Sequence, residues 1–247
     1  MTEVQVDQRT VAWHQLRRSV CITASCFADA IGIGRGKPYH FLQSLLEPPC
    51  DDEDFGTVYT QHGLCLEADI NEAYQLLTGL KTEPSGFWIA AGSSSLAGII
   101  GASPDAKVYQ NGRFVGLAEY KAPVYSVNWN SKGPCCRIPR SHMAQIQGQM
   151  AVCGAPWCDY MAVCTSTQQL VLFRVHFSPR YWSSVSASLR NFCDVLQVHF
   201  TIPIIVSNCL KIISVVCSQL LKNWIFYLPQ KSKQIDDDDD DNDDDVL

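Results

Sequence analysis

Apolar residues recur at helical spacing in several stretches of the chain, most clearly over residues 62–78. The positions that define this helix are Leu64, Leu66, Ile70, Ala73, Tyr74 and Leu77. Gly79 follows them in the position of a helix C-cap. The same reasoning predicts helices over 39–47, 141–152 and 178–198.

Residues 10–31 have the pattern of two helices separated by a short break. Thr23 or Ser25 is expected to cap the second helix, because a hydroxyl there can accept from free backbone N–H groups. Glycines 32, 34 and 36 end it.

Shorter apolar runs predict strands. The strongest case is the pair over 106–109 and 114–120, because Asn111-Gly112 between them is typical of a two-residue hairpin turn. Further strands are expected over 87–91, 96–101, 160–165 and 170–176.

The end of the chain differs in composition from the rest. We expect one folded domain over 1–198, a hydrophobic C-terminal extension over 199–228 and a disordered acidic tail over 229–247. A membrane span over 203–221 is disfavoured, because Lys211 and several polar residues interrupt the apolar run.

Charge and cysteine content limit the class of protein. The formal charge of −6 includes nine aspartates between Asp236 and Asp245, and removing those nine negative charges leaves +3. A slightly basic body is compatible with DNA binding. The twelve cysteines include no CxxC pair, so we expect free thiols rather than a zinc site. No secretory signal is recognisable, which favours an intracellular location, with nucleus and cytoplasm both open.

Candidate chemistry is concentrated on the predicted hairpin. Glu119 and Lys121 project to one face of their strand and Tyr120 to the other, while the turn brings Asp105 within reach of Glu119. Two adjacent carboxylates are costly unless a cation lies between them, and hard oxygen ligands favour magnesium or manganese. The lysine can help to activate a metal-bound water or stabilise developing negative charge. An ordinary cross-strand ion pair is the alternative interpretation.

Several motifs occur together in one order: Trp13-His14-x-x-Arg17-Arg18, then Ile22-Thr23-Ala24-Ser25, Gly63-x-x-x-Glu67, Ser103-Pro104-Asp105, Glu119-x-Lys121 and Ala144-Gln145-x-Gln147. This ordered set resembles the lambda-exonuclease-like branch, or YqaJ viral recombinase family, of the PD-(D/E)XK nuclease superfamily. The resemblance covers roughly residues 12–195. It implies an α/β fold with a restriction-endonuclease-like core, in which helices flank a mixed central β-sheet.

The resemblance also implies roles for individual residues. Lys121 would orient or activate the attacking water, and Gln145 would fix either Lys121 or that water. Two Mg²⁺ (or Mn²⁺) ions would be held by Glu67, Asp105, Glu119 and the backbone carbonyl of Tyr120.

A separate group would grip the 5′-phosphate of a DNA end. The resemblance assigns this role to Ser25 and a nearby arginine, whose forked guanidinium suits phosphate. This chain has one residue more between Trp13 and Ile22 than the family pattern, so Arg17 and Arg18 are both eligible. His14, His142 and Trp13 are expected to be packing or supporting residues.

Taken together, these features predict a Mg²⁺-dependent 5′→3′ exodeoxyribonuclease that acts on double-stranded DNA ends in recombination or repair. The alternative is a weak or inactive nuclease-fold module that binds DNA ends or a partner protein. Specificity for RNA or structured DNA also stays open. Family members can work beside a single-strand annealing protein, and no motif here encodes that contact. The unusual C-terminal segment leaves homo-oligomer formation open.

Overall fold

The computed structural model describes residues 2–46, 58–92, 94–123, 137–164, 166–167 and 169–201, of which 58–64 and 198–201 are described by their backbone alone. The predicted acidic tail and nearly all of the predicted hydrophobic extension lie outside these residues, so their boundaries stay predictions. In the part of the chain that is described, no helix is long and apolar enough to cross a membrane.

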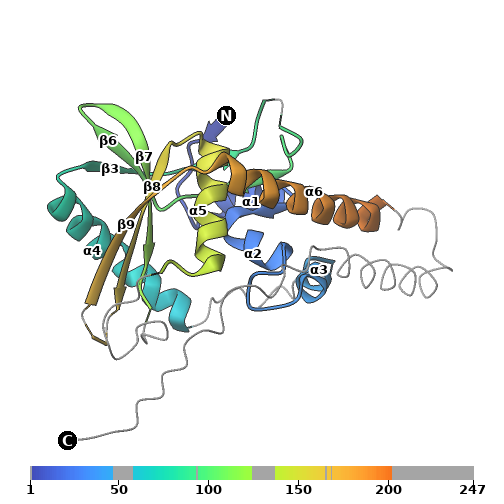
Figure 1. Ribbon diagram of the computed structural model, residues 1–247, viewed down its shortest axis with the longest axis horizontal. Helices are drawn as coiled ribbons and strands as arrows, with labels where there is room; N and C mark the ends of the chain where they lie inside the picture. Colours follow the sequence, from blue (N-terminus) through green and yellow to red (C-terminus); the bar gives the residue numbers. More distant parts are fainter. Residues whose placement is uncertain are drawn as a thin grey trace, which may run out of the picture. The chain divides into compact units, whose positions relative to one another are not determined.

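A five-stranded mixed sheet is the largest sheet of the described residues (Figure 1). Its strands, in order across the sheet, are β3 (Lys81–Pro84), β6 (Ala106–Gln110), β7 (Arg113–Lys121), β8 (Trp157–Cys164) and β9 (Gln169–His176). β7 and β8 are parallel, whereas the other neighbours are antiparallel. The expected mixed sheet is therefore confirmed. Asn111 and Gly112 join β6 to β7 with φ angles of 52° and 74°, as a left-handed two-residue turn requires.

Helices cover both faces of this sheet. On one face, α4 (Val58–Thr78) packs Ile70 and Tyr74 against Ala118 and Tyr120 of β7. Leu77, a predicted core position, is exposed, and Leu80 beyond the helix packs on the cluster instead. Gly79 has a φ of 68° and ends α4 as predicted.

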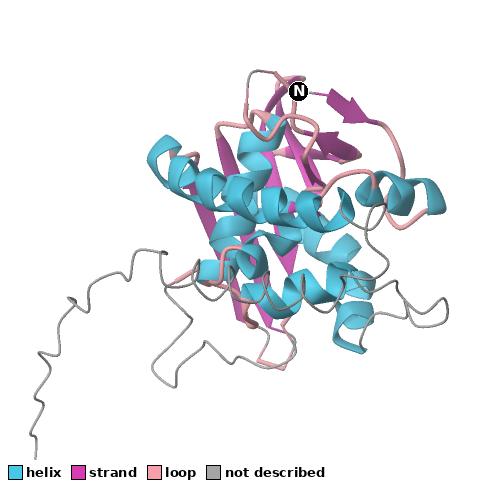
Figure 2. Cartoon of the chain, turned by 90° about the vertical axis from the view of Figure 1, so that its right-hand side faces the viewer, coloured by secondary structure: helices cyan, strands magenta, loops and turns pink. Residues whose placement is uncertain are grey.

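The parallel arrangement of β7 and β8 requires a crossover, and the chain supplies it with α5 (Arg140–Cys153). This helix covers the opposite face of the sheet from α4 (Figure 1), and the view in Figure 2 shows helices in front of the strands. Gly154 ends it in the left-handed conformation. Gly148 lies against Phe27 so closely that a Cβ atom would come within 2.4 Å of the ring, which permits tight packing of α5 on the N-terminal segment.

A second, four-stranded sheet was not predicted as such. Its strands, in order, are β1 (Thr2–Val4), β4 (Phe87–Ile89), β5 (Ile100–Ala102) and β2 (Ile22–Thr23). Sequence periodicity missed β1 and β2 because runs of two or three residues are too short to show alternation. The predicted strand over 96–101 is largely wrong. Residues 95–99 form a turn with Leu96 buried and Gly98 at a φ of 70°, and the strand begins at Ile100.

The N-terminal helices confirm one prediction and correct another. Two helical segments do occur, α1 (Val11–Arg18) and α2 (Phe27–Ala30), the second preceded by a 3-10 turn, η1 (Ala24–Cys26). Neither Thr23 nor Ser25 caps, because Thr23 belongs to β2 and its hydroxyl lies 3.2 Å from that of Ser25. The predicted helices near residues 39–47 and 178–198 are confirmed as α3 (Pro38–Leu46) and α6 (Pro179–Thr201).

Candidate active site

Strand β7 presents Glu119 and Lys121 on the face that α5 covers. The Lys121 Nζ atom donates to Glu119 Oε1 at 2.6 Å, and the Glu119 side chain is 2 % exposed. Tyr120, between them, faces α4. Burial alone would lower the pKa of Lys121, but the charges of Glu119 and Asp105 outweigh it and raise that pKa above its usual value. Lys121 is therefore a protonated, positively charged group in this site.

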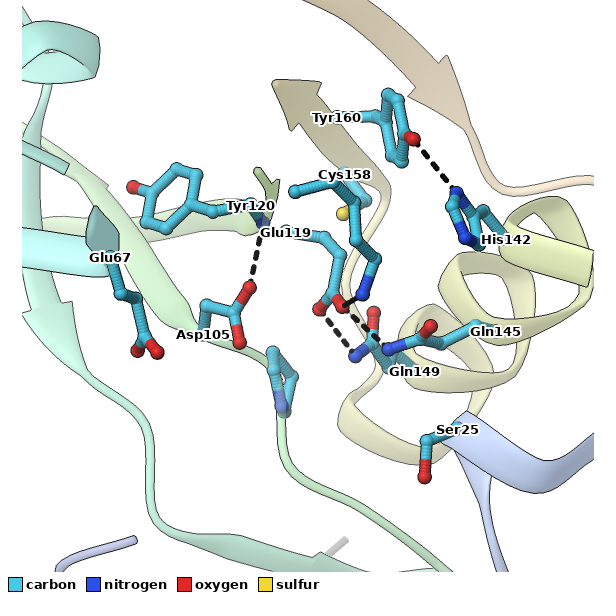
Figure 3. A network of polar contacts seen from close by, with 12 residues as sticks. Ser25, Glu67, Asp105, Glu119, Tyr120, His142, Gln145, Gln149, Cys158 and Tyr160 are labelled. Carbon is cyan, nitrogen blue, oxygen red and sulfur yellow. Dashed lines mark hydrogen bonds and ion pairs between the residues drawn. The ribbon is translucent and has the colours of Figure 1, made fainter. Parts of the chain in front are cut away.

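Two glutamines of α5 complete the surroundings of Glu119 (Figure 3). Gln145 Nε2 donates to Glu119 Oε1 at 2.5 Å, and Gln149 Nε2 donates to Glu119 Oε2 at 2.8 Å. Gln145 and Lys121 thus donate to the same carboxylate oxygen, and the expectation that Gln145 fixes either Lys121 or the attacking water stays a prediction. Gln147 points elsewhere and binds the backbone of His176 and Ser178.

Gln149 is the residue of this group that sequence reasoning missed. Its spacing of four from Gln145 places both on one side of the helix, and that signal was available. Its side chain is fully buried, and its Oε1 has no hydrogen-bond partner among the described residues. Among the described residues, the hydrogen bond to Glu119 is the one that its Nε2 atom makes.

Asp105 stands immediately before β6, at the end of the sheet where Glu119 lies. Ala106, the first residue of β6, pairs with Ala118, and Asp105 Oδ2 accepts the N–H of Tyr120 at 2.6 Å. Burial raises the pKa of Asp105 well above its usual value, and the negative charge of Glu119 adds to the effect. Asp105 thus carries a poorly compensated acidic group.

The third acid, Glu67, comes from α4. It lines two adjoining clefts together with Asp105, of about 360 and 240 Å³, and its charge also raises the pKa of Asp105. In Figure 3 the Asp105 carboxyl lies between those of Glu67 and Glu119. Glu67 forms an ion pair with Arg9.

These oxygens fit a divalent cation by their chemistry. Carboxylates are the hard ligands that magnesium and manganese prefer, and a cation would offset the charge crowding at Asp105. Within the described residues, however, no three acidic, histidine or cysteine side chains already converge on one ion position. Cationic and amide side chains bind two of the acids instead: Arg9 pairs with Glu67, and Lys121 pairs with Glu119.

A second polar group lies on the N-terminal segment. Arg17 Nη2 is 3.3 Å from Ser25 Oγ, and the Arg17 guanidinium stacks 4.5 Å above the ring of Trp13. Arg18 is exposed. Of the two eligible arginines, the structure therefore brings Arg17 to Ser25. The turn that carries Ser25 packs against α5, which joins this group to the glutamine helix.

A comparison with protein families identifies the family of the chain. The model of the YqaJ-like viral recombinase domain matches residues 12–156. This chain belongs to the YqaJ-like viral recombinase family. The match includes every predicted site residue, from Arg17 to Gln145. Among curated proteins, none matches the chain.

Solved structures confirm the restriction-endonuclease-like fold. An alkaline exonuclease from Laribacter hongkongensis is 22 % identical with a TM-score of 0.60, over 77 % of this chain and 94 % of that one. The same exonuclease in complex with dAMP matches with 21 % identity, the same TM-score and the same coverage. A phage-related exonuclease from Haemophilus somnus 129PT matches with 11 % identity and a TM-score of 0.54, over 74 % and 97 % of the two chains.

Two residues that were expected to have packing or supporting roles, His142 and Trp13, form hydrogen bonds near the acids of the YqaJ-like site. His142 Nδ1 lies 2.8 Å from the Tyr160 hydroxyl, and burial, with the charges of Lys121 and Arg35, lowers the pKa of His142 to about 4. His142 is therefore a neutral hydrogen-bonding group. Trp13 Nε1 donates to Ser103 Oγ at 2.9 Å, which ties the tryptophan to the Ser-Pro-Asp turn.

Proposed function

We propose that this YqaJ-like protein is a metal-dependent nuclease that acts on DNA, specifically a 5′→3′ exonuclease on double-stranded ends in recombination or repair. The observation that carries the proposal is the ion pair between the buried Glu119 and the partly exposed Lys121, beside Asp105, which shares two clefts with Glu67. Two acids and a lysine at the end of the central sheet, with a third acid on α4, are groups that can hold a divalent ion and stabilise charge in phosphodiester hydrolysis.

Each residue has a distinct part in this proposal. Asp105 and Glu119, with Glu67 and the carbonyl of Tyr120, would hold the divalent ions, whose charge lowers the pKa of a water and polarises the phosphate. Lys121 carries its proton, so its part is to stabilise negative charge on the phosphate oxygens rather than to accept a proton. Gln145 and Gln149 fix the orientation of the Glu119 carboxylate.

The 5′ polarity rests on Arg17 and Ser25. A guanidinium and a hydroxyl 3.3 Å apart offer donors to one terminal phosphate, and the stacking on Trp13 restricts the arginine. Phosphate contacts carry no sequence information, so we expect little sequence preference and an affinity that falls with salt.

The first test is hydrolysis of linear duplex DNA with Mg²⁺ by the full chain and by Lys121→Met. We expect nucleotide release by the wild type and a loss of at least about 100-fold in the variant, because a donor to the developing charge is removed. Lys81→Met, at an exposed lysine of β3, is the matched control. Equal activity of Lys121→Met and the wild type would contradict the proposal. Duplex binding without hydrolysis would support the end-binding alternative.

Polarity and substrate class need a second experiment. Duplexes with a 5′-phosphate or a 5′-hydroxyl are compared, with circular duplex, single strands and RNA alongside. Arg17→Gln should reduce the preference for the 5′-phosphorylated end about tenfold, since a charge-assisted bond to phosphate contributes on that scale. Arg18→Gln should change it less. Release from 3′ ends first would refute the proposed polarity and leave the nuclease assignment standing.

A further inference from the structure

The turn formed by Asp7, Gln8, Arg9 and Thr10 contacts two of the acids, or the backbone beside them, and sequence reasoning gave it no role. Gln8 Nε2 donates to the carbonyls of Pro104 at 2.8 Å and Ser85 at 3.1 Å. The Pro104 carbonyl belongs to the peptide that leads into Asp105. The next residue, Arg9, forms the ion pair with Glu67. Two consecutive residues therefore contact two proposed metal ligands: Gln8 binds the peptide before Asp105, and Arg9 binds the Glu67 carboxylate.

The backbone at Arg9 is held in a conformation that a non-glycine residue rarely adopts. Its φ is 69°, in the left-handed region, which persists only where the surroundings impose it. After Arg9, the Thr10 hydroxyl holds the turn, because it donates to the Asp7 carbonyl at 2.8 Å and accepts the N–H of Trp13 at 3.3 Å. Before Arg9, the hydrogen bonds of the Gln8 side chain hold the turn. The turn therefore fixes where the Arg9 side chain begins.

The strand before the turn is anchored as well. Glu3 pairs with the nearly buried Lys107 at 3.1 Å and accepts the N–H of Gly86 at 2.9 Å. These contacts hold β1 beside β4, so the segment that carries Arg9 is attached at both ends. The fold therefore positions the Arg9 guanidinium beside the Glu67 carboxylate.

The Arg9–Glu67 pair has the properties of an exchangeable contact. The Arg9 side chain is 43 % exposed and that of Glu67 27 %, and exposed ion pairs are weak. Both residues line the smaller cleft together with Asp105. A divalent ion carries twice the charge of a guanidinium and binds carboxylate oxygen directly.

We propose that Arg9 is the resident counter-cation of Glu67 and that a divalent ion must displace it to bind there. Arg9 then sets the metal concentration at which the Glu67 position fills, and it supports Glu67 in the metal-free protein. This inference rests on the proposed function, because it takes Glu67 as a metal ligand.

The test is titration of the full chain with Mn²⁺ by calorimetry. Arg9→Gln should bind Mn²⁺ about three- to tenfold more tightly than the wild type, and Arg9→Lys should lie between them. Arg113→Gln removes the same charge at an exposed position of the β6–β7 hairpin and should leave the affinity unchanged. In metal-free buffer, Arg9→Gln should melt at a lower temperature than the wild type, because Glu67 loses its partner.

A double-mutant cycle separates this effect from general electrostatics. In a Glu67→Gln background, Arg9→Gln should no longer tighten Mn²⁺ binding. A gain that persists there, or equal affinities of wild type and Arg9→Gln, would overturn the role of Arg9 and leave the proposed nuclease intact. If neither protein binds Mn²⁺, the inference and the metal-dependent function both fail. Binding by Arg9→Gln alone would support the inference.

Discussion

Two aspartates at the central sheet have opposite surroundings. Asp159, on β8, is 2 % exposed. Its carboxylate accepts hydrogen bonds from Nε and Nη2 of Arg174, at 2.8 and 2.7 Å. Its Oδ2 also accepts the Tyr74 hydroxyl at 2.7 Å. Asp105, beside β7, accepts one backbone N–H among the described residues and lies between two further acids. The charge of Asp159 is compensated by a bidentate ion pair, whereas neighbouring acids and burial raise the pKa of Asp105.

The partners of Asp159 are themselves fixed. The Arg174 guanidinium lies 3.8 Å above the Trp157 ring, and burial, with Asp159, raises the pKa of Tyr74 above its usual value, so the phenol stays a donor. On the α4 face of the sheet, Asp159 is thus bound by a cation and a hydroxyl of the protein itself. A buried acid near a functional site is therefore a candidate ligand only where its own fold leaves it under-compensated.

The largest expected effect is the loss of activity when Asp105, the less compensated aspartate, is changed. Asp105→Asn should reduce hydrolysis by at least about 1000-fold, because metal-derived charge stabilisation is worth several kcal/mol. Its metal-free melting temperature should stay the same or rise, since one of three neighbouring negative charges is removed. Turnover of linear duplex and a thermal melt in chelator measure the two quantities. A marked loss of metal-free stability would give Asp105 a structural role like that of Asp159.

At Asp159, the aspartate that Arg174 compensates, a substitution should reduce stability rather than activity. Asp159→Asn should cost about 2 kcal/mol of unfolding free energy, because it weakens the charge-assisted hydrogen bonds from Arg174 and Tyr74, while the partly exposed Arg174 can still be solvated. Chemical denaturation measures this cost. Asp194, on α6, has a side chain that is 48 % exposed, and Asp194→Asn should cost less than about 0.5 kcal/mol. Activity per folded molecule should be retained. A stable Asp159→Asn protein without activity would remove the distinction between the two aspartates.

The hairpin could be predicted from sequence because its determinants are local. The Asn-Gly turn sets the register, and the period of two puts Glu119 and Lys121 on one face whatever packs against it. The Asp159 network could not be predicted, since Tyr74, Asp159 and Arg174 come from three distant elements. Arg9 was missed for a related reason: its contact depends on a turn with positive φ and on a helix nearly sixty residues further along.

A substitution at Gln149 tests how strongly activity depends on the orientation of the Glu119 carboxylate. Gln149→Met keeps the shape of the buried side chain but removes the donor to Glu119 Oε2. We expect kcat to fall about 10- to 100-fold, as for other residues that orient a metal ligand, with little change in KM for duplex. Gln147→Met, which removes contacts to His176 and Ser178 instead, should reduce stability more than kcat. Equal kcat values for Gln149→Met and the wild type would show that Lys121 and Gln145 suffice.

The smallest effect concerns pH and His142. The pKa of His142 is about 4 in the folded protein and about 6.5 when unperturbed, so the neutral form is favoured on folding. As pH falls from 6.5 to 4, the unfolded chain binds a proton that the folded chain does not, and stability decreases. We expect this residue to account for about 2 kcal/mol of the difference between pH 7 and pH 4. Denaturant melts across that range should show a shallower decline for His142→Asn, while His40→Asn, at an exposed position, should follow the wild type. Parallel curves for His142→Asn and the wild type would mean that His142 is protonated in the fold, which would add a further positive charge beside Lys121.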